Sequence, residues 1–234
     1  MHKSASRYNM KRYEVILTEA EMRRLKRISN EYIPVDYIDK SNYKKYVGRK
    51  VNVIGDVCIQ SLGLEEIPIT FGKVGGYFDC SFNNISSLKG CPTEVGRGFD
   101  CSINRLVSLE GCPREVMRDF DCVSNRLTSL EGAPEKVGGY FDCGKNRLTS
   151  LEGAPREVGG YFSCYDNKLT SLEGAPKKMG GGFYCENNEL TSLKGAPEKV
   201  GGNFYCWGNP EEFTVADVKA VSTVGGDIEV SSGQ

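Results

Sequence analysis

The sequence predicts a repeat solenoid that is mainly β, a curved stack of about eight parallel strands with small α-containing caps at both ends. One observation is the spacing of seven cysteines, which recur every 21 residues. Another is that each has a Phe two residues before it and an Asn three residues after it. A fixed period of about 20 to 50 residues is typical of solenoids, because one unit cannot bury its own apolar face without stacked neighbours. The seven are Cys80, Cys101, Cys122, Cys143, Cys164, Cys185 and Cys206.

The repeated unit reads Phe-x-Cys-x-x-Asn-x-Leu-x-x-Leu-x-Gly-Ala-Pro-x-x-Val. An earlier copy precedes Cys80, although it lacks the cysteine. Its residues lie 21 positions before the Phe, the Cys, the two Leu and the Val of the next copy, and all of them are apolar. They are Val57, Ile59, Leu64, Ile67 and Val74. The sequence therefore predicts eight strands rather than seven.

The order of the first eleven positions is similar to the core pattern of leucine-rich-repeat proteins. The short unit and the Pro after the second Leu resemble the bacterial class of that family, and the block Leu-Thr-Ser-Leu-Glu-Gly-Ala-Pro resembles repeat proteins of bacteriophage genomes. The resemblance covers residues 51–209 and implies that the Asn column bonds to the backbone at each strand exit. At the strand start, where the family usually has a Leu, this chain has glycines such as Gly138 and Gly139.

Three regions follow from this pattern. Residues 1–50 are interpreted as a basic N-terminal cap, with a strand over 13–17 and a helix from Thr18 to about Ser29. Residues 51–209 form the solenoid. Residues 210–234 form a C-terminal cap, in which Thr214 and Asp217 start a helix and residues 227–230 form a last strand.

Charge is distributed unevenly between these regions. Residues 1–50 hold 13 Lys and Arg against 6 Asp and Glu, a net charge of +7, while the rest holds 17 against 25, a net charge of −8. A basic segment on an acidic solenoid is compatible with nucleic-acid contact, and equally with a cap whose charges face water or the repeat. Nucleic-acid binding is the less favoured of these interpretations.

Composition disfavours several classes of function. His2 is the single histidine, and neither a nucleotide-binding Gly-rich loop nor paired Cys-x-x-Cys spacing occurs, so we expect no catalytic residue, no cofactor and no metal. The ten cysteines are expected to be free thiols that pack as small apolar groups. No apolar run is long enough for a membrane span and no secretory signal is seen, which favours a bacterial or infected-host cytoplasm.

Side chains alternate along a strand, so if Phe and Cys point inward, the residues around them point outward onto the concave face. This face is predicted to carry an acidic row of Asp79, Asp100, Asp121 and Asp142, which repel one another and attract a cationic partner. It also carries an aromatic cluster of Tyr161, Tyr165, Tyr184, Tyr205 and Trp207. Beside it runs a basic row of Arg105, Arg126, Arg147 and Lys168.

These features predict a non-enzymatic protein-binding module, with a partner that presents a basic or arginine-bearing surface. The resemblance to bacteriophage repeat proteins implies a host-directed or anti-defence role. The alternatives are a virion or scaffold protein that self-associates, and nucleic-acid contact through residues 1–50. The candidate partner-binding residues are Tyr77, Asp79, Asp100, Asp119, Asp121, Tyr140, Asp142, Tyr161, Tyr165, Tyr184, Glu186, Tyr205 and Trp207.

Overall fold

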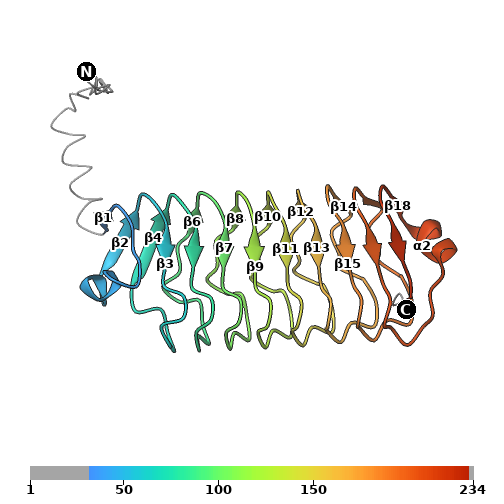
Figure 1. The fold of residues 1–234 in the computed structure, drawn as a ribbon, viewed down its shortest axis with the longest axis horizontal. Coiled ribbons are helices and arrows are strands. Elements are labelled where there is room, and N and C mark those ends of the chain that lie inside the picture. Colours follow the sequence, from blue (N-terminus) through green and yellow to red (C-terminus); the bar gives the residue numbers. More distant parts are fainter. Residues whose placement is uncertain (1–31, 232–234) are drawn as a thin grey trace, which may run out of the picture. The chain divides into compact units, whose positions relative to one another are not determined.

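The structure, a computed structural model, describes residues 32–231. These residues form a parallel β-solenoid in which each turn of the chain lies directly beside the next (Figure 1). Strands equivalent in successive repeats pair in register, as Phe141 pairs with Phe120 and Phe162. The prediction of a mainly β solenoid is confirmed.

Two parallel sheets run along the stack. Sheet A has ten strands among the described residues: β1 (Ile33–Val35), β2 (Lys50–Val53), β4 (Thr70–Val74), β6 (Glu94–Val95), β8 (Glu115–Val116), β10 (Lys136–Val137), β12 (Glu157–Val158), β14 (Lys178–Met179), β16 (Lys199–Val200) and β18 (Thr223–Val224). Sheet B has nine: β3 (Val57–Cys58), β5 (Phe78–Asp79), β7 (Phe99–Asp100), β9 (Phe120–Asp121), β11 (Phe141–Asp142), β13 (Phe162–Ser163), β15 (Phe183–Tyr184), β17 (Phe204–Tyr205) and β19 (Ile228–Glu229).

Sheet B contains the eight predicted strands, and β19 of the C-terminal cap adds a ninth. Sheet A was not predicted. Its strands are mostly two residues long, with a charged or polar residue pointing outward and a Val or Met pointing inward, and so short an alternation gives no clear period in the sequence. Pairing also begins before residue 51, because β1 adds a strand ahead of β2.

The core consists of in-register columns of identical side chains. The Phe rings of β5 to β17 are almost fully buried, and the ring centroids of neighbours lie 5.2 to 5.8 Å apart. The cysteines of the repeat and both Leu columns are buried beside them. Burial of Phe and Cys, on which the predicted outward face depends, is therefore confirmed. The stacked rings are Phe78, Phe99, Phe120, Phe141, Phe162, Phe183 and Phe204.

A glycine pair joins sheet A to sheet B in most rungs. A Cβ at Gly138 would overlap the backbone carbonyl of Met117 in the rung before, and one at Gly159 would overlap the carbonyl of Gly138. At these glycine rungs the backbones of successive rungs therefore approach too closely for a Cβ. This close approach accounts for glycine at these rungs, where the resemblance implies a Leu, whereas Ile54 and Met117 occupy the same column on two other rungs with exposed side chains.

The Asn column fixes the exit from sheet B. The side-chain amide of Asn146 donates to the carbonyls of Cys122, Cys143 and Gly144 at 3.0 to 3.1 Å, and its Oδ1 accepts from the backbone N–H of Leu127 at 3.0 Å. The same pattern recurs from Asn83 to Asn209. Each Asn therefore joins its own rung to the one before, and the predicted structural role is confirmed.

Both ends of the described part are capped by irregular or helical segments. At the N-terminal end, residues 32–49 include β1 and the short 3-10 helix η1 (Tyr43–Tyr46). At the C-terminal end, helix α2 (Val215–Val221) begins with the predicted capping box of Thr214 and Asp217. The strand and helix predicted within 13–29 lie outside the described residues. No helix in the described ranges has the length and apolarity that crossing a bilayer requires.

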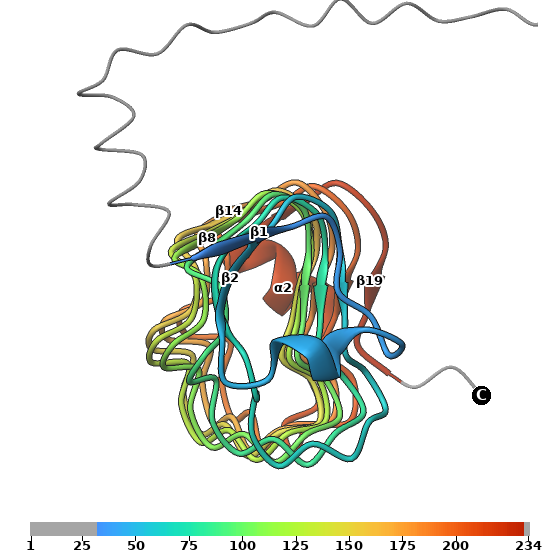
Figure 2. The same cartoon turned by 90° about the vertical axis from the view of Figure 1, so that its left-hand side faces the viewer.

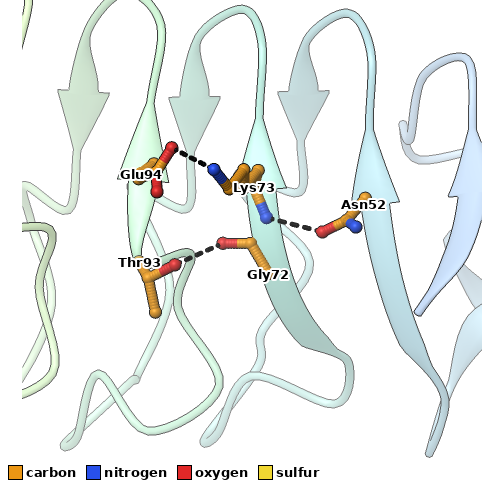
Figure 3. A network of polar contacts seen from close by, with 5 residues as sticks. All are labelled: Asn52, Gly72, Lys73, Thr93 and Glu94. Carbon is orange, nitrogen blue, oxygen red and sulfur yellow. Dashed lines mark hydrogen bonds and ion pairs between the residues drawn. The ribbon is translucent and has the colours of Figure 1, made fainter. Parts of the chain in front are cut away.

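Polar contacts also join successive strands on the outer side of sheet A. Figure 3 shows the first of them: the Lys73 N–H donates to Asn52 Oδ1 at 2.8 Å, and the Lys73 ammonium pairs with Glu94 at 2.8 Å. The Thr93 hydroxyl donates to the Gly72 carbonyl at 3.0 Å. These contacts hold the first rungs in register.

Candidate functional site

The candidate site lies on the outer side of sheet B. Viewed along the stack, the rungs overlay closely, so one position of the repeat becomes one row along the molecule (Figure 2). Three rows face outward here. They are formed by the residue before each Phe, the residue between Phe and Cys, and the residue after Cys. Most of the larger side chains in these rows are half-buried, since neighbouring rungs partly cover them.

The acidic row occupies the middle position on four consecutive strands, and its members pair in register. In every one of them, Oδ1 accepts a hydrogen bond from the backbone N–H two residues ahead, as from Ser81 to Asp79 at 3.0 Å and from Val123 to Asp121 at 3.0 Å. These bonds hold the carboxyl groups against the sheet. The row is therefore part of the strand exit as well as an outward display.

Burial, more than mutual repulsion, determines the protonation of this row. Burial raises the pKa of Asp121 from its usual 3.8 to about 7, and the carboxyl groups of Asp100 and Asp142 raise it further. Burial also raises the pKa values of Asp100 and Asp142 themselves. At neutral pH the row therefore carries fewer charges than the sequence suggests.

The raised pKa of Asp121 predicts a pH-dependent stability. Between about pH 4 and pH 7 the folded protein holds a proton that the unfolded chain has lost, so stability falls as pH rises through this window. Asp121→Asn is expected to flatten this slope and to be more stable than the wild type at pH 8, measured by urea unfolding at several pH values. Glu135→Gln, exposed and distant from the row, is the control. Parallel profiles for the wild type and Asp121→Asn would contradict the prediction.

Three members of the aromatic cluster, Tyr161, Tyr184 and Tyr205, form a continuous series of ring contacts, and Tyr140 extends it. The rings of Tyr140 and Tyr161 are parallel, with their centroids 4.7 Å apart. The ring centroids of Tyr161 and Tyr184 lie 5.5 Å apart, and those of Tyr184 and Tyr205 lie 5.2 Å apart. Burial raises the pKa of Tyr140 to about 12, so its hydroxyl stays protonated. These four rings therefore form a connected aromatic surface over four rungs.

Glycines in the outward rows make room for these rings. The ring of Tyr165 covers Gly144, where a Cβ would overlap it, and the ring of Tyr184 covers Gly182 in the same way. At the other end of the sheet, Tyr77 covers Gly98 and has the Arg97 guanidinium 6.0 Å from its ring centre. Some of the aromatic rings thus pack over glycine backbone, which is a structural alternative to a role in binding.

Glu186 lies within the aromatic cluster, between Tyr165 and Trp207 in the row that follows Cys. Its Oε2 is buried and has no hydrogen-bond partner among residues 32–231. Burial raises the pKa of this carboxyl to about 7, and the negative charge of Asp166 raises it further. A buried polar atom without a partner is costly, so this position would gain from a cationic or hydrogen-bond-donating ligand.

The predicted site residues fall into two groups. The acidic row and Tyr77 lie on the N-terminal half of sheet B, and the aromatic cluster with Glu186 lies on the C-terminal half. Tyr140 and Asp142 on β11 mark where the two groups meet, and Asp119 accepts the Tyr140 N–H at 3.1 Å. The sequence did not predict the unpartnered Glu186, because one Glu in a variable column has no recognisable pattern.

The cysteines of the repeat pack as buried thiols behind sheet B. All ten are free, and seven form a buried column behind the acidic row. Burial raises the pKa of Cys122 and Cys143 well above the usual range, and their thiols donate to the carbonyls of Asp142 and Ser163 at 3.3 and 3.2 Å. Within the described ranges, no group of three or more His, Cys, Asp or Glu side chains could hold a metal ion.

The outer side of sheet A has a different chemical character. A shallow groove of about 890 Å³ crosses β10 to β16, with a floor that includes the glycines of the glycine pairs. Its charged lining residues are mostly basic, and Lys136 is paired with Glu157 at 2.7 Å. The remaining cations that line it are Arg156, Lys177, Lys178 and Lys199. Basic residues therefore gather on sheet A between β10 and β16, whereas the acidic row and the aromatic cluster lie on sheet B.

The regular, in-register rungs define the fold as a parallel β-solenoid. The outward rows of sheet B are where the residues differ from rung to rung. Comparisons with protein-family models, with curated proteins and with solved structures give no significant match to this chain.

Proposed function

We propose that this chain is a non-enzymatic protein-binding module whose partner docks on the outer side of sheet B. The core columns repeat with little change, whereas the outward rows vary from rung to rung, and this combination suits recognition by a rigid scaffold. Half-exposed Tyr and Trp side chains offer contact area that loses little entropy on binding, as in many binding hot spots.

The observation that carries this proposal is the unpartnered carboxyl oxygen of Glu186 between Tyr165 and Trp207. An arginine of a partner could stack on an aromatic ring and donate to this oxygen after a small rotation of the side chain. The bond would satisfy the buried atom and lower the pKa of Glu186 from about 7. We therefore place the centre of the docking surface on β15 and β17.

The acidic row would provide a second contact for the same partner. Basic groups that approach it would favour the ionised form of Asp121 and so release its proton. The partner is accordingly an arginine-bearing or otherwise basic protein segment that runs along sheet B. The sequence resemblance favours a bacteriophage protein of the leucine-rich-repeat type. Such a protein would act in a cytoplasm on a host protein or a defence protein.

A selection from a randomised peptide display library, with the full chain as bait, tests this proposal. The wild type is expected to enrich peptides in which Arg stands beside apolar residues. In the triple variant Tyr184→Ala, Tyr205→Ala and Trp207→Ala, the enrichment should fall by about tenfold or more. Truncating hot-spot side chains commonly weakens binding by this amount. Binding of one enriched peptide is then measured by calorimetry for both proteins.

Two further variants make the result specific. Glu186→Gln keeps the shape of the side chain but removes its charge. This variant is expected to bind the Arg-containing peptide more weakly, while its circular dichroism spectrum stays that of the wild type. Lys178→Glu with Lys199→Glu changes sheet A and should leave peptide binding unaffected. Equal enrichment by the wild type and the triple variant would overturn the proposed site. The alternative of nucleic-acid contact predicts instead that residues 1–50 are needed to shift a labelled oligonucleotide at low salt.

A further inference from the structure

A long connection leaves sheet B after each Asn and returns to sheet A, and it closes every rung (Figure 2). Its first part, six residues long, carries two charged rows. The basic row that follows the Asn column consists of Arg105, Arg126, Arg147 and Lys168, and all four side chains are exposed. Five positions later on the same four rungs stands an acidic counterpart, the glutamate row, also exposed: Glu110, Glu131, Glu152 and Glu173.

The local structure holds the two rows apart and facing outward. Between them the two Leu columns point into the core, as Leu148 and Leu151 are fully buried. The Glu position is fixed by a turn in which the backbone N–H of Glu152 donates to Ser150 Oγ at 3.0 Å. The backbone N–H of Arg147 donates to the Leu127 carbonyl of the preceding rung at 2.9 Å, which sets the spacing of the basic row.

These charges are almost entirely unused within the described part of the chain. No ion pair among residues 32–231 involves the basic row, and in the glutamate row only Glu173 is paired, with Lys194 at 2.9 Å. Elsewhere on the surface, Lys73 with Glu94 and Lys136 with Glu157 do pair across neighbouring rungs. Each of the two rows instead places like charges next to one another at the rung spacing of about 5 Å, which is unfavourable without a partner.

We propose that two copies of this chain associate through this surface, with their stacks parallel and related by a two-fold axis along the stack. Such an axis exchanges the two margins of the surface, so the basic row of one copy faces the glutamate row of the other. The spacing matches without adjustment, because both rows have the period of the same rungs. Arg126 meets Glu131 of the second copy, and Arg147 meets Glu152, at both margins.

The strip between the two rows permits this approach. Its exposed position is a short β-branched residue on each of the four rungs, with Thr128 and Thr149 on the central ones and Val107 and Thr170 on the outer ones. Short side chains at the axis allow the long Arg and Glu side chains to meet at the margins. An antiparallel arrangement, with the axis across the stack, would instead place Arg against Arg and is disfavoured by charge.

The contact is small, since four rungs span only about 15 to 20 Å. Its area lies at the low end of specific interfaces, and its ion pairs are exposed to solvent. We therefore expect a weak dimer, with a dissociation constant on the order of 10 to 100 µM at low salt. Screening by about 0.5 M salt should weaken it by on the order of tenfold or more.

Charge exchange tests this arrangement by sedimentation velocity on the full chain. One variant carries Arg126→Glu with Arg147→Glu, and the other carries Glu131→Arg with Glu152→Arg. Each variant alone is expected to be monomeric at concentrations where the wild type dimerises, because its two margins then carry like charges at the central rungs. An equimolar mixture of the two is expected to form a heterodimer, because every reversed side chain again meets its opposite.

A matched control separates this contact from attraction between any oppositely charged proteins. The control variant Lys178→Glu with Lys199→Glu changes the net charge by as much as Arg126→Glu with Arg147→Glu does, but on sheet A. It should dimerise as the wild type does. Mixed with the Glu131→Arg, Glu152→Arg variant, it should form no more heterodimer than the wild type does. A wild type that stays monomeric at low salt overturns the proposal. The proposal is also overturned if the mixture of the two charge-reversed variants remains monomeric. It is overturned as well if the sheet A control forms heterodimers with the Glu131→Arg, Glu152→Arg variant to the same extent as the Arg126→Glu, Arg147→Glu variant does. Circular dichroism verifies that each variant is folded, and this proposal does not depend on the proposed binding function of sheet B.

Discussion

Phe141→Ala is expected to lower the free energy of unfolding by about 3 to 5 kcal/mol, the range for truncating a fully buried Phe. Phe141 is inaccessible to solvent and stacks between Phe120 and Phe162 at 5.2 and 5.3 Å. The substitution removes contacts with both neighbouring rungs and leaves a cavity in a column that continues on each side. In a solenoid, stability depends on interfaces between neighbours, so a gap in the middle of the stack weakens both halves.

Urea unfolding followed by far-UV circular dichroism measures this effect. Phe82→Ala is the matched control, because Phe82 lies on the strand exit with 54% of its surface exposed. We expect that variant to stay within about 0.5 kcal/mol of the wild type, as is usual for surface substitutions. If Phe141→Ala and Phe82→Ala have the same midpoint, the continuous Phe column is not what holds the rungs together.

The sequence was sufficient to predict the stack, its register and the content of sheet B. This was possible because Phe141, Cys143 and Asn146 recur without insertion, and a period without slips can be satisfied only by rungs that lie side by side. The helix cap at Thr214 was also predictable, since a capping box is a local pattern with its own physical cause.

Sheet A and the strand exits were not predictable in the same way. Residues such as Ile103, Ser124 and Lys145 adopt left-handed backbone angles of φ 51°, 56° and 52°, although none is glycine. Such a conformation costs on the order of 1 kcal/mol or more per residue, and the sequence gives no sign of it because the residue type varies. The neighbouring Asn offsets this cost with hydrogen bonds to two rungs. The Asn column itself was predicted, but the left-handed conformation of the residue before it was not.

The candidate site shows the same division. The positions of the acidic row and the aromatic cluster followed from strand alternation alone. Their electrostatics did not, because the pKa of Asp121 depends on how far neighbouring rungs cover it, and burial proved to be its main determinant. The unpartnered Oε2 of Glu186 likewise depends on side-chain packing and has no counterpart in the repeat pattern.

Asn83→Ala is expected to lower the free energy of unfolding by about 2 to 4 kcal/mol, because it leaves several buried backbone groups without partners. The Oδ1 of Asn83 accepts from the N–H groups of Leu62 and Leu64 at 3.0 and 2.9 Å. Its amide donates to the carbonyls of Ile59, Cys80 and Ser81 at 2.9 to 3.1 Å. The three bonds to carbonyls are buried, and only 8% of Asn83 is exposed, so water cannot readily replace its amide in the folded protein.

The adjacent residue provides the control. Asn84→Ala changes the same residue type one position further along, where Asn84 is half-buried and its side chain makes no hydrogen bond with any residue in 32–231. Unfolding of both variants in urea should therefore separate the ladder amide from general effects of losing an Asn. Near-equal midpoints would mean that the backbone groups around Asn83 find other partners. A large difference would show that the rungs are joined at the strand exit by side-chain amides, in addition to the strand pairing and the Phe column. It would also explain why Asn stays constant while the residues beside it vary, because only a side chain with both a donor and an acceptor can join two rungs there.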